Sequence, residues 1–312
     1  MKTILKSRFF EFNLILFPVW ILFVYFFINS LIISKELTFF LFLFLFGETH
    51  FASTFLFYLN SKNFNYIKSK FYALIAIPII IVLIYIIIGI VDFETAIILG
   101  AIGSGIHVTR QSIGIQRLYG FTRNIFFENI TYIASFGFIF VGFCRFYLEN
   151  IIERLNIKLE LFFLDNYNLN QFFIILVIVL SIISFTEKTN LKKRLVNLTG
   201  VLIYSPYLFV TNVYDAIIIG VGAHWCQYLA INYKVYFYNE KFTKNKIFII
   251  LFIFSYAFIM SSLGYKYQFD KVINLLILIP LSGQFFHYYV DAFIWRFSDN
   301  HIRETVGKKL FS

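Results

Sequence analysis

The stretch YALIAIPIIIVLIYIIIGIVD, residues 72–92, has no charged side chain before its final aspartate. About 20 apolar residues are what an α-helix needs to cross the hydrocarbon core of a bilayer. Comparable runs recur along the 312-residue chain, and only 14% of its residues are charged, whereas a soluble domain carries about 25%. The sequence therefore predicts an all-α, polytopic integral membrane protein folded as a helical bundle.

About ten such runs are predicted to cross the membrane, and we expect them to form a single transmembrane domain over residues 1–312. The first run is longer than the apolar core of a signal peptide, and no small-residue cleavage site follows it, so we expect it to be retained. The longest connection between predicted spans is residues 149–169. The predicted spans are residues 14–33, 37–59, 72–92, 94–118, 126–148, 170–186, 196–211, 213–236, 246–264 and 272–297.

The basic side chains predict the orientation of the bundle. The formal net charge is +10, which in a soluble protein would suggest a nucleic-acid partner. Here the positive charges lie mostly in short loops, so topology is the simpler explanation and no nucleic acid is expected. An excess of Lys and Arg marks cytoplasmic loops, which predicts two cytoplasmic termini and a bacterial inner membrane. The predicted cytoplasmic segments are residues 1–13, 60–71, 119–125, 187–195, 237–245 and the tail from Ser298.

Four of the five histidines lie inside predicted spans, and the fifth, His301, lies in a polar tail where we expect it to be solvated. The four spans run in the same direction, and their histidines come 11–15 residues after the predicted span starts. At 1.5 Å per residue, this places all four within a slab about 6 Å thick near the middle of the membrane. These histidines are His50, His107, His224 and His287.

Other polar side chains are predicted near the same level, where such groups usually face the interior of a bundle. Asp291 or Glu48 could accept a hydrogen bond from a ligand imidazole and fix its tautomer. Arg110 is expected either to pair with one of these carboxylates or to anchor a polar or anionic group. Gln227, one turn after His224, completes the set.

Four imidazoles at one depth predict a transition-metal site, because imidazole is a good ligand for iron, zinc, copper and nickel. No residue beyond these metal ligands is predicted to be catalytic. Two alternatives stay open: a transporter or lipid-binding membrane protein that handles protons or substrate with the buried His, Glu, Arg and Asp cluster, or four histidines that separately bridge helices. Haem fits poorly because paired axial histidines would favour two levels. The histidine spacings of membrane desaturases, such as H-x-x-x-H, do not occur.

Each of the four histidines lies in a short stretch of a recognisable kind. The stretches are Gly47-Glu48-Thr49-His50, Ile106-His107-Val108, Ala223-His224-Trp225 and Phe286-His287 through Asp291. They resemble the motifs of the Brp/Blh-type membrane β-carotene oxygenases, although the third stretch has one histidine where the family has two. The resemblance implies that the four histidines bind a non-haem iron (Fe²⁺). It also implies a dioxygenase reaction, in which a polyene double bond of a carotenoid-like, lipid-soluble substrate is cleaved to aldehydes in an aromatic-lined cavity open to membrane lipid.

Overall fold

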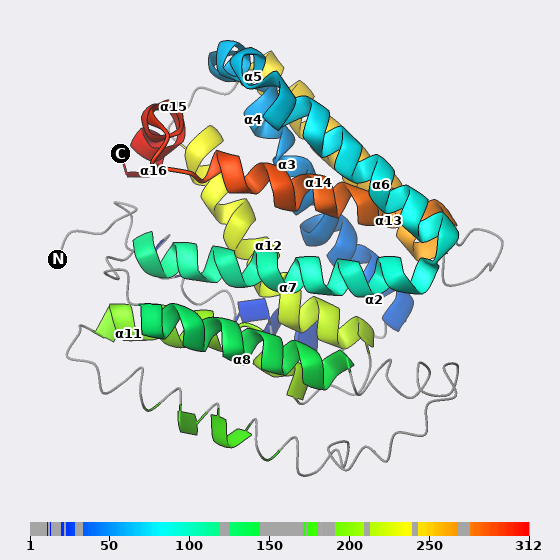
Figure 1. The fold of residues 1–312 in the computed structure, drawn as a ribbon, viewed down its shortest axis with the longest axis vertical. Helices are drawn as coiled ribbons and strands as arrows, with labels where there is room; N and C mark the ends of the chain where they lie inside the picture. The colour runs from blue at the N-terminus through cyan, green and yellow to red at the C-terminus, as the bar shows by residue number, and fades with distance from the viewer. Residues whose placement is uncertain are drawn as a thin grey trace. The chain divides into compact units, whose positions relative to one another are not determined.

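The computed structural model describes residues 34–118, 125–143, 191–208, 213–238, 243–266 and 275–311, with scattered positions between 11 and 28 and between 171 and 182. The predicted spans 14–33 and 170–186 fall wholly or largely outside these residues, and the predicted loop 149–169 falls outside them. Within the described residues every regular element is a helix (Figure 1), which confirms the all-α prediction.

Most of the described helices follow the predicted spans; for example, the span predicted at 213–236 coincides with helix α12. The span predicted at 196–211 is wrong in its bounds, because α11 begins at Leu191, inside the predicted cytoplasmic segment 187–195, and ends at Val201. The elements are α2 Lys35–Phe42, η1 Leu43–Glu48, α3 Thr49–Ser53, α4 Phe55–Leu59, η2 Ser61–Asn63, α5 Phe64–Ser69, η3 Tyr72–Ala76, α6 Ile77–Val91, α7 Phe93–Leu118, α8 Ile125–Phe143, α11 Leu191–Val201, η6 Ser205–Leu208, α12 Val213–Tyr236, α13 Lys244–Lys266, α14 Leu278–Ile294, α15 Asn300–Ile302, η8 Arg303–Gly307 and α16 Lys308–Phe311.

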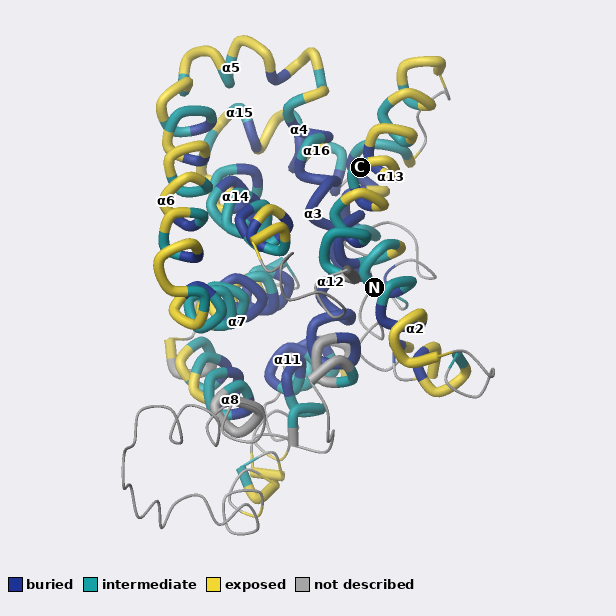
Figure 2. The backbone as a smooth tube through the Cα atoms, turned by 90° about the vertical axis from the view of Figure 1, so that its right-hand side faces the viewer, coloured by how far each residue is buried: buried dark blue, intermediate teal, exposed yellow. Residues whose placement is uncertain are grey.

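Two helical stretches of the described chain, Tyr72–Val91 and Lys244–Gly264, are long and apolar enough to cross a membrane. Only 22% and 17% of their most apolar windows are buried inside the protein, and Figure 2 shows that much of α6 is exposed. Exposed apolar helices of this length are what a lipid environment accommodates, so they give support for membrane association. The ten-span bundle, its orientation and the particular membrane stay predictions.

The chain forms two compact units. One comprises residues 1–14, 29–104 and 225–312, and the other comprises residues 15–28 and 105–224. The boundary between residues 104 and 105 falls inside α7, and the boundary between residues 224 and 225 falls inside α12. These two helices therefore contribute residues to both units. The expectation of a single transmembrane domain stays a prediction.

In the first unit, α6 packs along α14 through a close approach at Gly89. A Cβ atom at this position would collide with the side chain of Leu278, which is itself fully buried. Tyr85 packs in the same buried cluster as Leu278, and its hydroxyl donates to the Ala96 carbonyl of α7 at 2.8 Å. Small residues let membrane helices approach closely, so Gly89 sets the distance at which α14, the helix that carries His287, is held.

A π-helical turn, η1, directly precedes the helix that carries His50. Helices α2, η1, α3 and α4 follow one another from Lys35 to Leu59, and η1 and α3 pack against α13. A π-turn places one more residue in the turn and so changes which side chains face inward. Glu48, the last residue of the turn, is buried, as is the whole of α3.

In the second unit, α7 and α8 run antiparallel. A Cβ atom at Gly105 would lie 2.7 Å from Ile139 Cδ1. Farther along the pair, Arg117 Nη2 forms an ion pair with Glu128 Oε1 at 2.6 Å. Helix α8 also packs against α11 and η6. The half of α7 that follows His107 therefore has one side fixed by helix packing.

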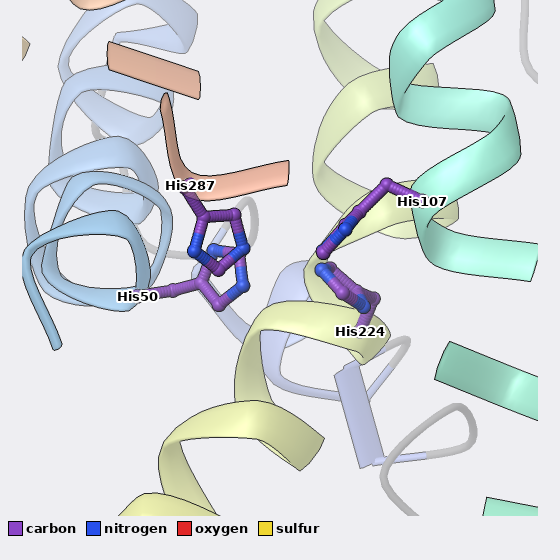
Figure 3. A group of neighbouring side chains, drawn as sticks. All are labelled: His50, His107, His224 and His287. Atoms are coloured by element: carbon purple, nitrogen blue, oxygen red, sulfur yellow. The ribbon is translucent and has the colours of Figure 1, made fainter. Parts of the chain in front are cut away.

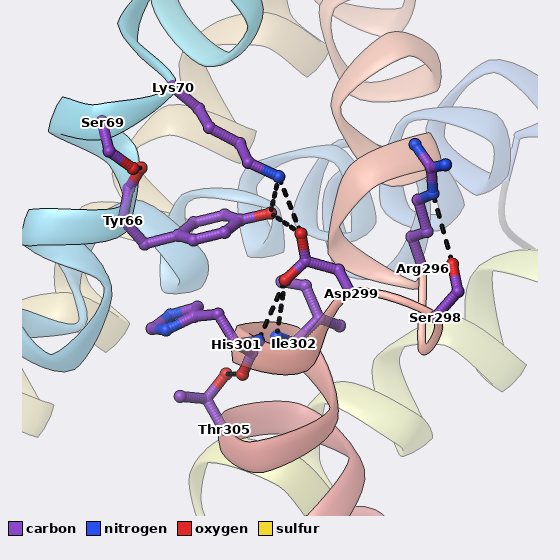
Figure 4. Close-up of polar contacts among 9 residues, drawn as sticks. All are labelled: Tyr66, Ser69, Lys70, Arg296, Ser298, Asp299, His301, Ile302 and Thr305. Carbon is purple, nitrogen blue, oxygen red and sulfur yellow. Dashed lines mark hydrogen bonds and ion pairs between the residues drawn. The ribbon is translucent and has the colours of Figure 1, made fainter.

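The C-terminal tail is tied to η2 and α5, which corrects the expectation that His301 is solvated. The His301 ring is partly buried, stacks on Tyr66 with ring centroids 4.3 Å apart, and has Nε2 2.9 Å from Asn63 Oδ1. Beside it, Lys70 Nζ donates to Asp299 Oδ2 at 2.7 Å (Figure 4). These partners come from a distant part of the sequence, so local polarity did not reveal them.

We predict that Gly89→Ala destabilises the protein by about 1–3 kcal/mol, because its methyl group overpacks the α6–α14 contact. The double variant Gly89→Ala/Leu278→Ala should lose less stability than the sum of the losses in the two single variants, since the two side chains compete for the same space. Thermal unfolding in detergent measures both. Gly114→Ala is the matched control, because none of the described residues has an atom within 4 Å of a Cβ atom built there. Equal effects at the two glycines would contradict this packing account.

We predict that docking of the tail weakens in two steps as the pH falls. Burial lowers the pKa of His301 below its ordinary value of 6.5, so protonation of the undocked ring favours release below about pH 6.5. The hydrogen bond from Lys70 is the main cause that lowers the pKa of Asp299 from 3.8 to about 2, so the carboxylate's contribution is lost between these values. Lys70 is well exposed, which limits the ion pair to at most about 1 kcal/mol.

Hydrogen–deuterium exchange of residues 300–311, corrected for the intrinsic pH dependence of exchange, measures this release. His301→Gln should remove the first step and Asp299→Asn the second. Tail protection that is unchanged from roughly pH 7 to pH 5 in the unaltered chain would show that His301 does not hold the tail.

Candidate metal centre

His50 and His287 form one buried pair. His50 lies on α3 and His287 on α14, and both are fully buried. Their ring centroids lie 4.3 Å apart with the rings inclined at 74° (Figure 3). At this distance, the imidazole nitrogens of residues on two different helices lie close together. Such proximity is the first requirement for two side chains to bind the same metal ion.

The His287 ring is anchored through one of its nitrogens. Thr54, one turn after His50, has its Oγ1 2.6 Å from His287 Nδ1. The other nitrogen, Nε2, lies 3.6 Å from Asp291 Oδ2, which is too long for a hydrogen bond. With Nδ1 engaged, Nε2 is the atom available for a metal, and a hydrogen bond to the opposite nitrogen is the usual way in which such a ring is oriented.

Tyr228 of α12 contacts both rings of this pair. Its ring centroid is 4.5 Å from that of His50 and 5.2 Å from that of His287, each in an edge-to-face arrangement. Its hydroxyl donates to Asp291 Oδ1 at 2.5 Å. Both the tyrosine and the carboxylate are buried. The Asp291 carboxylate is therefore held by a hydrogen bond and positioned beside His287.

The backbone that carries His50 is fixed by a second polar contact from α12. Asn232 Nδ2 donates to Ser53 Oγ at 2.9 Å, and the Ser53 hydroxyl donates to the His50 carbonyl at 2.6 Å. All three residues are buried. Breaking a hydrogen bond between buried groups costs free energy because it leaves unsatisfied polar atoms. These contacts therefore fix the backbone of α3 at His50 relative to Asn232 of α12.

His107 of α7 and His224 of α12 form the other buried pair. Their ring centroids lie 4.9 Å apart and the rings are nearly perpendicular, at 89° (Figure 3). His107 is 8% exposed and His224 1% exposed. Gln111, one turn after His107, has its Nε2 3.5 Å from the His224 carbonyl oxygen, at the limit of a hydrogen bond. The glutamine thus connects α7 to the backbone of the second histidine.

The four histidines make up a group whose potential ligand atoms all lie within 4.8 Å of one another. Two ligands on one ion with bonds of about 2.0–2.2 Å lie at most about 4.4 Å apart, so the group is within a few tenths of an ångström of what a single ion requires. The four predicted histidines lie close together, and their all-imidazole donor set could hold a transition-metal ion.

The other predicted site residues differ in their surroundings. Glu48 is 3% exposed, Gln227 5% and Asp291 6%, whereas Arg110 lies on the exposed side of α7. Asp291 lies beside His287, as described above. In the described part of the chain, Glu48 Oε2 is buried without a hydrogen-bond partner. The expected pairing of Arg110 with a carboxylate stays a prediction.

Four contributors were not among the predicted site residues: Thr54, Tyr228, Ser53 and Asn232. A signal for two of them was present, because Thr54 follows His50 by four residues and Tyr228 follows His224 by four, and residues at this spacing share a helix face. The same rule had identified Asp291 after His287. Ser53 and Asn232 act through the backbone, and no spacing reveals such a role.

No known family model, no curated protein and no solved structure matches the chain. The resemblance to the Brp/Blh-type oxygenases therefore rests on the four motif stretches alone. Function has to be argued from the chemistry of the site, since function lies in sites rather than in folds.

Proposed function

We propose that the protein is a membrane-embedded, metal-dependent oxygenase that uses an iron ion held by His50, His107, His224 and His287. The single observation that carries the proposal is the convergence of these four buried imidazoles within 4.8 Å. Ionisable side chains inside a membrane protein are costly and usually functional. A shared metal ion gives all four rings one role.

The choice of iron follows from donor chemistry and from the motif resemblance. Neutral imidazole nitrogens suit iron, zinc, copper and nickel, whereas magnesium and calcium prefer oxygen ligands. Among the first group, iron and copper carry out oxygen chemistry. The motif resemblance to iron-dependent carotenoid oxygenases selects iron, and the Asp291 carboxyl group beside His287 supplies a further oxygen atom close to the proposed site.

We further propose a lipid-soluble, carotenoid-like polyene as substrate, supported by the aromatic residues near the His50–His287 pair. The Phe51 ring centroid lies 5.2 Å from that of His287, and Tyr288 lies next to both. Apolar and aromatic walls bind a hydrocarbon chain and exclude bulk water. When bound, the metal would supply activation of O₂. The residues around it would hold the polyene and limit side reactions with water.

The proposed reaction balances without an external reductant. One double bond of the polyene is broken, both atoms of one O₂ molecule are incorporated, and two aldehyde groups form. The organic substrate supplies the electrons. A membrane enzyme with this chemistry has membrane lipid and a lipid-soluble small molecule as its partners and requires no nucleic acid.

The proposal predicts about one iron per chain in protein purified without chelators, as a single mononuclear site implies. His107→Ala should lose most of the metal, because truncation removes one of four ligands. His301→Ala is the matched control, since this histidine lies in the tail and outside the four-histidine group. Elemental analysis of the three proteins measures the result. Absence of metal from the unaltered protein would overturn the proposal and favour proton or substrate handling by the same cluster, as in a transporter.

A second prediction concerns Thr54, which orients His287 without being a ligand. Thr54→Val keeps the shape of the side chain but removes the contact with Nδ1, and we expect metal affinity to fall roughly 10- to 100-fold. Thr54→Ser retains the hydroxyl and should bind nearly as tightly as the unaltered protein. Competition with a chromophoric chelator measures the affinities. Equal affinities for the valine and serine variants would show that the hydroxyl does not orient a ligand.

A further inference from the structure

One side of α7 carries both His107 and several features that do not suit a lipid-facing or closely packed surface. A helix turns 100° per residue, so Arg110, Gln111 and Gly114 all lie within about 60° of the direction of His107. Gly105 lies on the opposite side, where it packs against Ile139. The His107 side of α7 is therefore distinct from the side fixed by α8.

Gly114 faces open space. We compared the described glycines by asking which atoms lie within 4 Å of the place where a Cβ atom would be. Among the glycines compared, only Gly114 has no such neighbour in the described part of the chain. Glycine inside a helix is unfavourable relative to alanine, and close helix packing is the usual compensation. Because no described residue makes such a contact at Gly114, the position leaves room beside α7 two turns after His107.

Gln111 lies between Gly114 and the histidine pair. Its amide nitrogen approaches the His224 carbonyl at 3.5 Å. Its amide oxygen, Oε1, is buried and has no hydrogen-bond partner among the described residues. A buried polar atom without a protein partner is normally satisfied by water, and the space at Gly114 on the same side of the helix is where such water would enter.

Arg110 supplies the third observation. The exposed surface of α7 is apolar at Ile102 and Ile106, which are 46% and 41% exposed, and becomes basic at Arg110, which is also exposed. A charged side chain within a membrane span faces a water-filled cavity or the protein interior rather than lipid. The change from isoleucine to arginine therefore marks where the surface beside α7 passes from lipid to water.

We propose that Arg110, Gln111 and Gly114 line a water-filled vestibule that opens on the side of the membrane predicted to be cytoplasmic and leads to the His107–His224 pair. Its positive charge, from the Arg110 guanidinium, selects small water-soluble molecules that are anionic over those that are cationic. The vestibule itself needs no bound metal; its use to exchange water or small anions at the metal centre rests on the proposed function.

Cysteine accessibility tests the vestibule directly. In a chain with Cys144→Ala and Cys226→Ala, single cysteines are placed at Gln111 and Gly114, with two controls on the same helix. Ile106→Cys is exposed but faces the apolar surface, and Ile113→Cys is packed, with the native side chain 4% exposed. Charged methanethiosulfonates applied to the cytoplasmic face of vesicles should modify the first two at least about tenfold faster than the controls, because only a hydrated thiol forms the reactive thiolate.

The charge and the path are tested in the same background. In Gly114→Cys, we expect the anionic reagent to react faster than the cationic one; Arg110→Gln should reduce this preference and Arg110→Lys should keep it. Gly114→Phe fills the space beside Gln111. It should slow modification of Gln111→Cys at least about tenfold, because a thiol that water does not reach forms little thiolate. Thermal unfolding of Gly114→Phe verifies that the variant chain is folded.

An unreactive Gln111→Cys, or an Ile106→Cys that reacts as fast as Gly114→Cys, would overturn the vestibule. Metal content measured on the same preparations separates the two proposals. If the protein binds metal but Gln111→Cys is unreactive, the vestibule alone is refuted. If Gln111→Cys is reactive but the protein, with all four histidines intact, binds no metal, only the proposed function is refuted.

Discussion

The burial of four imidazole rings among apolar helices is the constraint on which the proposed site depends. None of the four is more than 8% exposed, and a polar group removed from water raises the free energy of the folded state unless it is satisfied. In the proposed account, one metal ion satisfies all four rings together. The hydrogen bond between Thr54 and His287, and the edge-to-face contacts of Tyr228, then set the directions in which the rings can point.

Helix α12 has a central part in this arrangement. His224, Tyr228 and Asn232 follow one another at four-residue spacing, which places them on one face of the helix. Through this face α12 presents a potential ligand, contacts the rings of His50 and His287, and fixes the backbone of α3 through Ser53. A single well-packed helix that carries three such groups is a rigid support, and rigid supports are what a metal site with preferred geometry requires.

A common depth for the four histidines was predicted from two regular quantities, the length of apolar runs and the rise of a helix. That prediction led to the expectation that the four side chains share one site. Which rings pair could not be predicted, because rotation of each helix about its axis is set by packing; the π-turn at Leu43–Glu48 changes that rotation immediately before His50. His301 was misjudged because its hydrogen-bond partner, Asn63, is 238 residues away in sequence. The exposure of Arg110 likewise depends on neighbours that spacing along the chain does not reveal.

X-ray absorption spectroscopy of the purified protein tests the central claim most directly, because it reports both the identity of a bound metal and the atoms around it. The account predicts an iron edge and a nitrogen-rich first shell at about 2.0–2.2 Å, with the outer-shell scattering that several imidazole rings produce. The same spectrum from His107→Ala should lose most of the iron signal. A protein without a bound transition metal, or a metal whose first shell lacks imidazole scattering, would contradict the claim that the four buried histidines form a metal centre.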